Sequence, residues 1–270
     1  MILDLPPQPV AFIQSLPEVS PSAAVRAQAA LMCARASGQK VDKFIVFDAG
    51  RSANEKRLFV LDVRGEPKLV LSDWVAHGSG SDPDRDGNAT QFSNTPNSNA
   101  TSLGLYRIAE RYRGRNPGSS YRLDGLTAGF NTNARGRAVV VHTSRYVQPG
   151  RVGRSWGCPA LRPEVMEELD ELGMQDTMLW IDAEGKGLDQ SASLDCPAAR
   201  ELVASYERYE ARELAMIAFQ AQLDRWVSPQ MSIAASVGWG RQTNAGAICV
   251  SRQEPRNKTR AHSGPCCVGA

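Results

Sequence analysis

The chain has 270 residues, of which 42% are hydrophobic and 22% are charged, and this is the composition of a folded globular protein rather than a disordered one. Its 31 basic and 29 acidic residues leave a net charge of +2, so no global charge favours nucleic acid or a membrane surface as a partner. No apolar run reaches the roughly 18 residues of a membrane-spanning helix, and the start of the chain lacks the basic and apolar regions of a signal peptide.

The first forty residues predict a loose leader and one helix. Residues 1–19 are rich in proline, so we expect no regular structure there. Ser20 can cap a helix over residues 21–37, which is rich in alanine and which Gly38 would end.

Short β-branched and aromatic runs begin at Lys43 and predict a series of strands, the first three antiparallel. The expected strands cover residues 44–47, 58–63, 69–75, 103–108, 121–123, 138–141 and 178–181. Residues 78–99 are polar and too many for a simple turn, which indicates a surface loop near a functional site. Proline at position 163 and nearby acidic residues predict a helix over residues 163–172.

Beyond Asp182, a polar linker leads into a predicted long helix over residues 198–227. Leu202, Tyr206, Tyr209, Met216 and Leu223 lie roughly along one stripe of it. Residues 228–270 show no period and are expected to be poorly ordered. The expected organisation is a leader and helix (1–40), a catalytic domain (41–183), a linker and long helix (184–230), and a tail (231–270).

The six cysteines have no repeating spacing and predict neither a disulfide framework nor a zinc site. They are Cys33, Cys158, Cys196, Cys249, Cys266 and Cys267. His262 lies near the last two, but a solvated tail is the simpler interpretation of this group. We therefore expect no metal and no cofactor.

The informative segment places Cys158 sixteen positions after His142. The histidine follows a strongly β-branched run, so it is expected at a strand end, and Gly157 permits a tight turn before the cysteine. A cysteine acts as a nucleophile in its thiolate form, and a neighbouring imidazole can take its proton. The amides of Gly157 and Cys158 could then face a developing oxyanion.

This arrangement resembles the murein L,D-transpeptidase (YkuD-like) catalytic domain, in the branch where the nucleophile turn reads Gly157-Cys158-Pro159-Ala160. Further blocks that match this branch follow in the same order, at residues 74–78, 91–96, 101–106, 121–126 and 129–134. The resemblance covers residues 41–182. It implies an α+β fold, mostly β, with a sandwich or barrel core, a short helix after the catalytic turn and flanking N- and C-terminal helices.

The resemblance also implies a two-step acyl transfer on peptidoglycan stem peptides. Cys158 would attack the bond between a diamino acid and the terminal D-alanine, and the thioester would pass to an amine (transpeptidase) or to water (carboxypeptidase). Three positions depart from the better-known family pattern, which has histidine in place of Trp156, glycine in place of Thr143 and aspartate in place of Thr132.

Several other residues are candidates for the site. Ser155 could form a hydrogen bond with His142 or with the substrate, or serve only as a turn residue. Trp156 could form one wall of the substrate site or pack against the protein. Arg154, Thr143 and His77 are further substrate-binding candidates, although a structural histidine is the stronger interpretation of His77. The segment from residue 107 to residue 162 contains eleven arginines but only two acidic residues, Glu110 and Asp124. This local excess of positive charge favours an anionic ligand or a solvated basic face. They are Arg107, Arg111, Arg113, Arg115, Arg122, Arg135, Arg137, Arg145, Arg151, Arg154 and Arg162.

Two other function classes stay open. One is a catalytically inactive peptidoglycan-binding module, and the other is a papain-like peptidase or amidase, which would normally place its cysteine before its histidine. The expected partners are stem peptides, with no nucleic acid and no membrane span. A periplasmic or wall-associated location follows from the substrate alone, since no signal peptide is visible.

Overall fold

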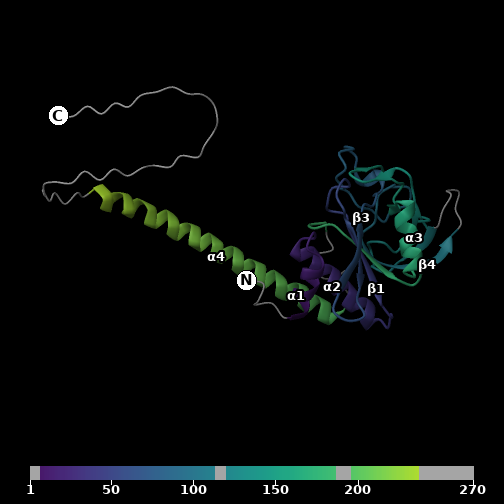
Figure 1. The fold of residues 1–270 in the computed structure, drawn as a ribbon, viewed down its shortest axis with the longest axis horizontal. Coiled ribbons are helices and arrows are strands. Elements are labelled where there is room, and N and C mark those ends of the chain that lie inside the picture. Colours follow the sequence, from purple (N-terminus) through teal and green to yellow (C-terminus); the bar gives the residue numbers. More distant parts are fainter. Residues whose placement is uncertain (1–6, 113–119, 187–195, 237–270) are drawn as a thin grey trace, which may run out of the picture. The chain divides into compact units, whose positions relative to one another are not determined.

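A computed structural model describes residues 7–112, 120–186 and 196–236 of the chain, and side chains for residues 11–112, 120–186 and 196–224 (Figure 1). The chain divides into two units at residues 218 and 219, inside its last helix. The first unit carries the sheet and the candidate site. Of the second, the structure describes a helical backbone as far as Ser236.

Ten strands and four α-helices make up the described chain. The helices are α1 (Pro7–Ser15), α2 (Pro21–Ala36), α3 (Pro163–Glu171) and α4 (Pro197–Ser236), with a 3-10 turn η2 at Ser79–Ser81. The strands are β1 (Lys43–Asp48), β2 (Leu58–Asp62), β3 (Lys68–Asp73), β4 (Gly104–Tyr112), β5 (Ser120–Gly125), β6 (Val140–Thr143), β7 (Val147–Gln148), β8 (Arg151–Val152), β9 (Ala160–Leu161) and β10 (Met178–Asp182). The predicted α+β class is confirmed.

Eight strands form one curled sheet in the order β3-β2-β1-β10-β4-β5-β6-β9, and β7 and β8 form a separate ribbon. The predicted antiparallel pairing of the first three strands is correct, but β1 with β10 and β6 with β9 are parallel. The chain that follows β3, at one edge of the sheet, continues to β9, at the other edge. There Ala76 and Ala160 exchange two backbone hydrogen bonds. The sheet is thereby almost closed on itself, as a barrel-like core requires.

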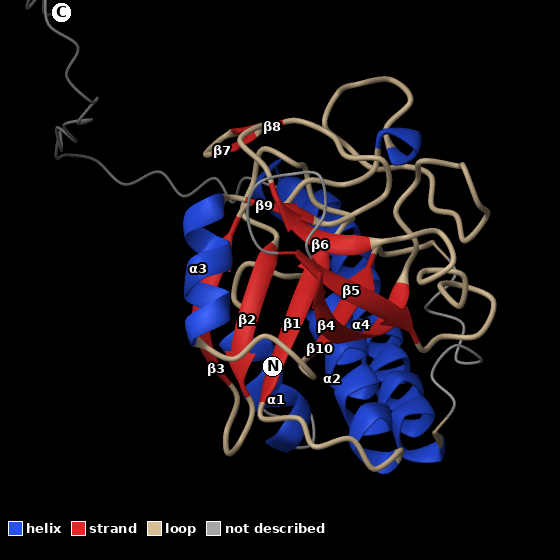
Figure 2. Cartoon of the chain, turned by 90° about the vertical axis from the view of Figure 1, so that its right-hand side faces the viewer, coloured by secondary structure: helices blue, strands red, loops and turns tan. Residues whose placement is uncertain are grey.

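Helix α2 packs on the central strands β1 and β10. Figure 2 shows it behind these strands, with α3 at the side of the sheet. The predicted cap is present, since Ser20 Oγ accepts from the Ala23 amide at 3.2 Å. Most of the buried residues of this helix are alanines, whose small side chains allow the helix to approach the sheet closely.

The predicted loose leader is wrong, because residues 7–15 form α1. Phe12 and Leu16 are buried in the same core as α2. A proline-rich segment can begin a helix, since proline is tolerated in the first turn, and α1 starts at Pro7.

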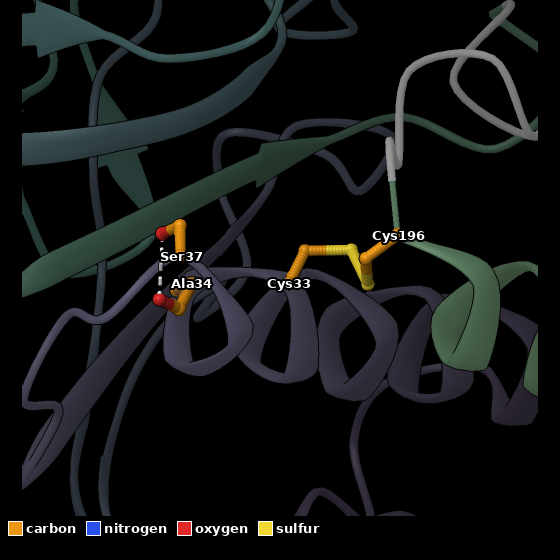
Figure 3. Close-up of a disulfide and its surroundings, with 4 residues drawn as sticks. All are labelled: Cys33, Ala34, Ser37 and Cys196. Carbon is orange, nitrogen blue, oxygen red and sulfur yellow. Dashed lines mark hydrogen bonds between the residues drawn. A yellow bond between two sulfur atoms is a disulfide. The ribbon is translucent and has the colours of Figure 1, made fainter.

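A disulfide joins Cys33 in α2 to Cys196 at the start of α4, with the two Cα atoms 5.4 Å apart (Figure 3). The spacing of the cysteines did not predict this bond. The two residues are separated by 163 positions, and such a long closed loop is typically worth 2–4 kcal/mol, roughly, because the bridge restricts the unfolded chain.

Helix α4 begins on the core and then leaves it. Ala199, Val203 and Tyr206 are buried, whereas Met216 is 57% exposed. The predicted stripe is thus covered only at its N-terminal end. The helix runs to Ser236, so the prediction of poor order from residue 228 is wrong as far as residue 236, and the remaining tail lies outside the described residues.

Asp48 and Asp182 lie opposite each other at the ends of the parallel strands β1 and β10. Burial, and then the charge of Asp182, raises the pKa of Asp48 from 3.8 to about 6. Arg26 Nε donates to Asp182 Oδ2 at 2.8 Å, and Asp182 Oδ1 has no partner among the described residues. Ionised Asp48 therefore repels the carboxylate of Asp182, whose negative charge is paired only with Arg26 among the described residues.

Asp48→Asn is expected to stabilise the protein at pH 7.5 by about 1–3 kcal/mol, measured by chemical denaturation. When folding raises the pKa of a carboxyl group, the folded protein becomes less stable as that group ionises, which here happens as the pH rises from about 4 through about 6. The advantage of the asparagine variant should therefore vanish at pH 4. An asparagine variant that is less stable than wild type at pH 7.5 would contradict this account.

Candidate active site

The cysteine turn and the histidine strand are adjacent in the sheet. Strands β6 and β9 run parallel with His142 opposite Ala160, and the His142 amide donates to the Pro159 carbonyl at 3.2 Å. Cys158 directly precedes Pro159. The structure therefore holds the two residues of the predicted pair on neighbouring backbone segments.

The Cys158 sulfur is partly buried against β6. The Val140 amide donates to Sγ, with nitrogen and sulfur 3.5 Å apart. Val140 and His142 are two positions apart on one strand, so their side chains share a face, and both are only partly buried. Cys158 is the one free cysteine within the part of the chain that the structure describes.

A main-chain oxygen orients the His142 ring. The separation between Nδ1 and the Thr143 carbonyl oxygen is 3.0 Å. Because a carbonyl can only accept, the proton of a neutral ring resides on Nδ1, which leaves Nε2 as an acceptor. A histidine that takes a thiol proton through Nε2 needs this tautomer.

Burial decides the resting protonation of the pair. It raises the pKa of the Cys158 thiol, while the Val140 amide and Arg137 oppose that effect. It also lowers the pKa of His142, against the opposing bond to the Thr143 carbonyl. Both shifts favour a neutral thiol and a neutral imidazole as the resting pair.

Ser155 holds the turn together and does not bond His142. Its hydroxyl donates to the Cys158 carbonyl at 2.6 Å and accepts from the Gly157 amide at 3.1 Å. The Gly157 amide is therefore occupied inside the turn, and the Cys158 amide is the remaining candidate donor to an oxyanion. Gly157 has φ +111°, a conformation that glycine adopts without strain.

Three backbone segments meet at Gly78. A Cβ at this position would lie 2.2 Å from the Asn99 carbonyl oxygen and 2.6 Å from the Gly157 Cα. The Gly78 amide also donates to Thr101 Oγ1 at 2.9 Å. The absence of a side chain thus allows the chain after β3 to support the cysteine turn directly.

Gly78→Ala is expected to destabilise the protein by roughly 2–4 kcal/mol, because backbone atoms must move to admit the methyl group. Denaturant unfolding measures the change. Gly65→Ala is the matched control, since its Cβ would meet nothing within 4 Å. A Gly78→Ala variant as stable as Gly65→Ala would show that the segments are less tightly packed than described.

His77 is a structural residue. It is completely buried, and Arg57 Nη2 donates to its Nδ1 at 2.8 Å. Burial, and then the Arg57 charge, lowers the pKa of His77 to about 4, so the ring is neutral. The buried ring and its bond to Arg57 agree with the structural interpretation and leave the alternative, a contact with substrate, without support.

The remaining candidates differ in how far their side chains are exposed. Trp156, two positions before the cysteine, is 84% exposed and available for contact with a substrate. The Thr143 side chain is buried, and only its carbonyl oxygen contacts the site, at the His142 ring. Arg154 Nη1 donates to the Asp82 carbonyl at 2.9 Å. Arg154 therefore braces the loop that follows β3 through one of its terminal nitrogens.

Six of the nine arginines of this segment that the structure describes lie within ion-pair distance of a carboxylate. Arg107 and Arg135 bond Asp124, and Arg162 bonds Asp73. The predicted anionic-ligand surface is therefore largely neutralised. Within the described residues, no group of three or more His, Cys, Asp or Glu side chains is arranged to hold a metal ion, and His262, Cys266 and Cys267 lie outside them.

Sequence reasoning passed over Arg137. Its guanidinium lies close to the cysteine turn, since a Cβ on Gly157 would be 3.3 Å from Nη2. In the sequence it is one arginine among eleven, and nothing local distinguishes it.

A family model described as the L,D-transpeptidase catalytic domain matches residues 16–181. A search of curated proteins found no significant match. Solved structures similar to this chain include a Bdellovibrio bacteriovorus protein, Bd1075 (14% identity, 63% of this chain and 56% of that chain, TM-score 0.36). Others are L,D-transpeptidases from Xylanimonas cellulosilytica (18%, 61% and 81%, 0.32) and Mycobacterium smegmatis (12%, 53% and 59%, 0.32). The chain thus spans little more than half the length of two of these three structures.

Proposed function

This chain belongs to the L,D-transpeptidase catalytic domain family, and from that membership we propose that it is a cysteine-dependent acyltransferase acting on peptidoglycan stem peptides. Cys158 is the nucleophile and His142 is the base. The observation that carries the proposal is that one strand, β6, supplies both the histidine and the amide that contacts the sulfur.

The first half-reaction follows from the neutral pair. The Sγ–H proton passes to His142 Nε2 as sulfur attacks the carbonyl carbon between the diamino acid and the terminal D-alanine. The oxyanion forms beside the Cys158 amide. The carbon–nitrogen bond then breaks, the departing D-alanine amine takes the proton from Nε2, and a thioester remains on Cys158.

The second half-reaction reverses these roles. An acceptor amine, or water, attacks the thioester carbonyl while Nε2 takes its proton, and sulfur leaves and recovers a proton from the imidazolium. An amine acceptor gives a cross-link, and water gives a shortened stem. The exposed face of Trp156 would lie against the bound substrate, because an indole offers a broad apolar contact at little entropic cost.

Extracytoplasmic location is part of the proposal. Peptidoglycan lies outside the cytoplasmic membrane, and the Cys33–Cys196 disulfide supports an oxidising compartment, where such bonds persist. No helix among the described residues is long and apolar enough to span a membrane.

The test is the release of D-alanine from purified tetrapeptide muropeptides, followed by mass spectrometry. The expected products are D-alanine together with tripeptide stems, cross-linked dimers or both, and the ratio of dimer to tripeptide separates transpeptidase from carboxypeptidase. Pentapeptide muropeptides are the matched control, since their terminal bond joins two D-alanines. Absence of D-alanine from the tetrapeptide substrate would overturn the proposal and favour a binding module.

A further inference from the structure

The guanidinium group of Arg137 lies next to the residue that precedes the nucleophile. Its Nη2 donates to the Ala100 carbonyl at 2.6 Å, and a Cβ on Gly157 would lie 2.9 Å from that oxygen and 3.3 Å from Nη2. Arg137 also lies three positions before Val140, whose amide contacts the Cys158 sulfur. The cation is thus connected to both segments that enclose the sulfur.

The donors of Arg137 are already occupied. Nη1 donates to the Ser93 carbonyl at 2.8 Å and to Ser102 Oγ at 3.1 Å, and Nη2 donates to Ser98 Oγ at 3.2 Å as well as to Ala100. These bonds use all four Nη hydrogens. A substrate carboxylate binding in the bidentate manner would have to displace at least one of these acceptors. The geometry therefore argues against a carboxylate-binding role.

The charge of Arg137 is not neutralised. All four of its acceptors are uncharged oxygens, and no carboxylate in the described part of the chain lies within ion-pair distance of it. Arg135, two positions earlier, pairs with both Glu110 and Asp124. A partly buried cation without a counter-ion acts strongly on a neighbouring group that becomes negative.

The group near Arg137 that becomes negative in the proposed reaction is the Cys158 sulfur. Arg137 lowers the pKa of Cys158, against the larger and opposite effect of burial. Desolvation of the thiol would otherwise make its ionisation costly, and a fixed cation that needs no reorganisation offsets part of that cost.

We infer that Arg137 is a positioning residue that holds the loop of residues 93–102 against the nucleophile turn and stabilises the Cys158 thiolate as it forms. The inference rests on the proposed function for its place in the reaction, although the effect on the thiol exists without any substrate.

The test is the pH dependence of Cys158 alkylation by iodoacetamide, followed by peptide mass spectrometry so that other thiols do not contribute. Arg137→Met is expected to move the midpoint upward by about 1 pH unit and to slow alkylation about tenfold at pH 7. Arg137→Lys, which keeps the charge, should move it less. Arg135→Met is the matched control and should leave the midpoint unchanged, because that cation is already paired.

Each outcome decides the inference. An unchanged midpoint in Arg137→Met, or an equal shift in Arg135→Met, would overturn it. Arg137→Gln, which keeps amide donors for the loop acceptors, serves the same comparison if the methionine variant does not fold. The alkylation assay contains no peptidoglycan, so failure of wild-type D-alanine release would sink the proposed function while leaving the thiol measurement intact.

Discussion

Cys158→Ala is expected to reduce D-alanine release from tetrapeptide muropeptides by at least about 10³-fold, because the proposed acyl intermediate forms on that sulfur. Mass spectrometry of the intact protein should also lose the adduct that corresponds to the thioester. The fold should survive, since removing one partly buried sulfur leaves a small void that costs about 1 kcal/mol. Circular dichroism and thermal unfolding check that point.

The matched control is Cys249→Ala, which also replaces one cysteine and lies far from residue 158 in sequence. It is expected to keep wild-type D-alanine release. Release that persists in Cys158→Ala would end the nucleophile assignment, whereas equal losses in both variants would indicate a general effect of cysteine removal.

The regular part of the fold follows from local patterns in the sequence. Ser20 and Pro21 predict the start of α2, and the β-branched run before His142 predicts β6 because these signals act within a few residues. The parallel pairing of β6 with β9 is different, since β9 has only two residues and exists through its contacts with distant segments. Length and local composition cannot reveal such a strand.

The chemical part of the site divides in the same way. The turn around Cys158 and the strand of His142 are visible as motifs, but protonation depends on burial, which only the folded chain determines. Arg137 and Arg135 stand two positions apart and look alike in sequence. Their roles differ because one meets uncharged oxygens and the other meets two carboxylates. The disulfide is hidden for a related reason, since Cys33 and Cys196 share no local signal.

His142→Gln is expected to lower D-alanine release by about 10²–10⁴-fold, the usual contribution of a general base. The glutamine amide can still donate to the Thr143 carbonyl, so the strand should keep its conformation. What the variant lacks is an acceptor with a pKa suited to take the thiol proton. The measurement is kcat/KM for tetrapeptide muropeptides over a range of pH.

The shape of the pH profile separates this mechanism from one that begins with a thiolate–imidazolium pair. Burial lowers the pKa of His142 below its ordinary 6.5, so the neutral base persists at pH 6.5 and the wild-type rate should fall only at lower pH. Burial raises the pKa of Cys158, so in His142→Gln the inflection below pH 6.5 should vanish and the rate should instead climb with pH toward ionisation of the thiol.

His77→Gln is the matched control for the loss of a histidine near the site. Its ring is buried and bonded to Arg57, so the variant should lose stability yet keep the acidic limb of the wild-type profile. If His142→Gln retained that limb and His77→Gln lost it, the base would be His77. Because the His77 ring is completely buried and already accepts a hydrogen bond from Arg57, that result would require the chain after β3 to open before each turnover.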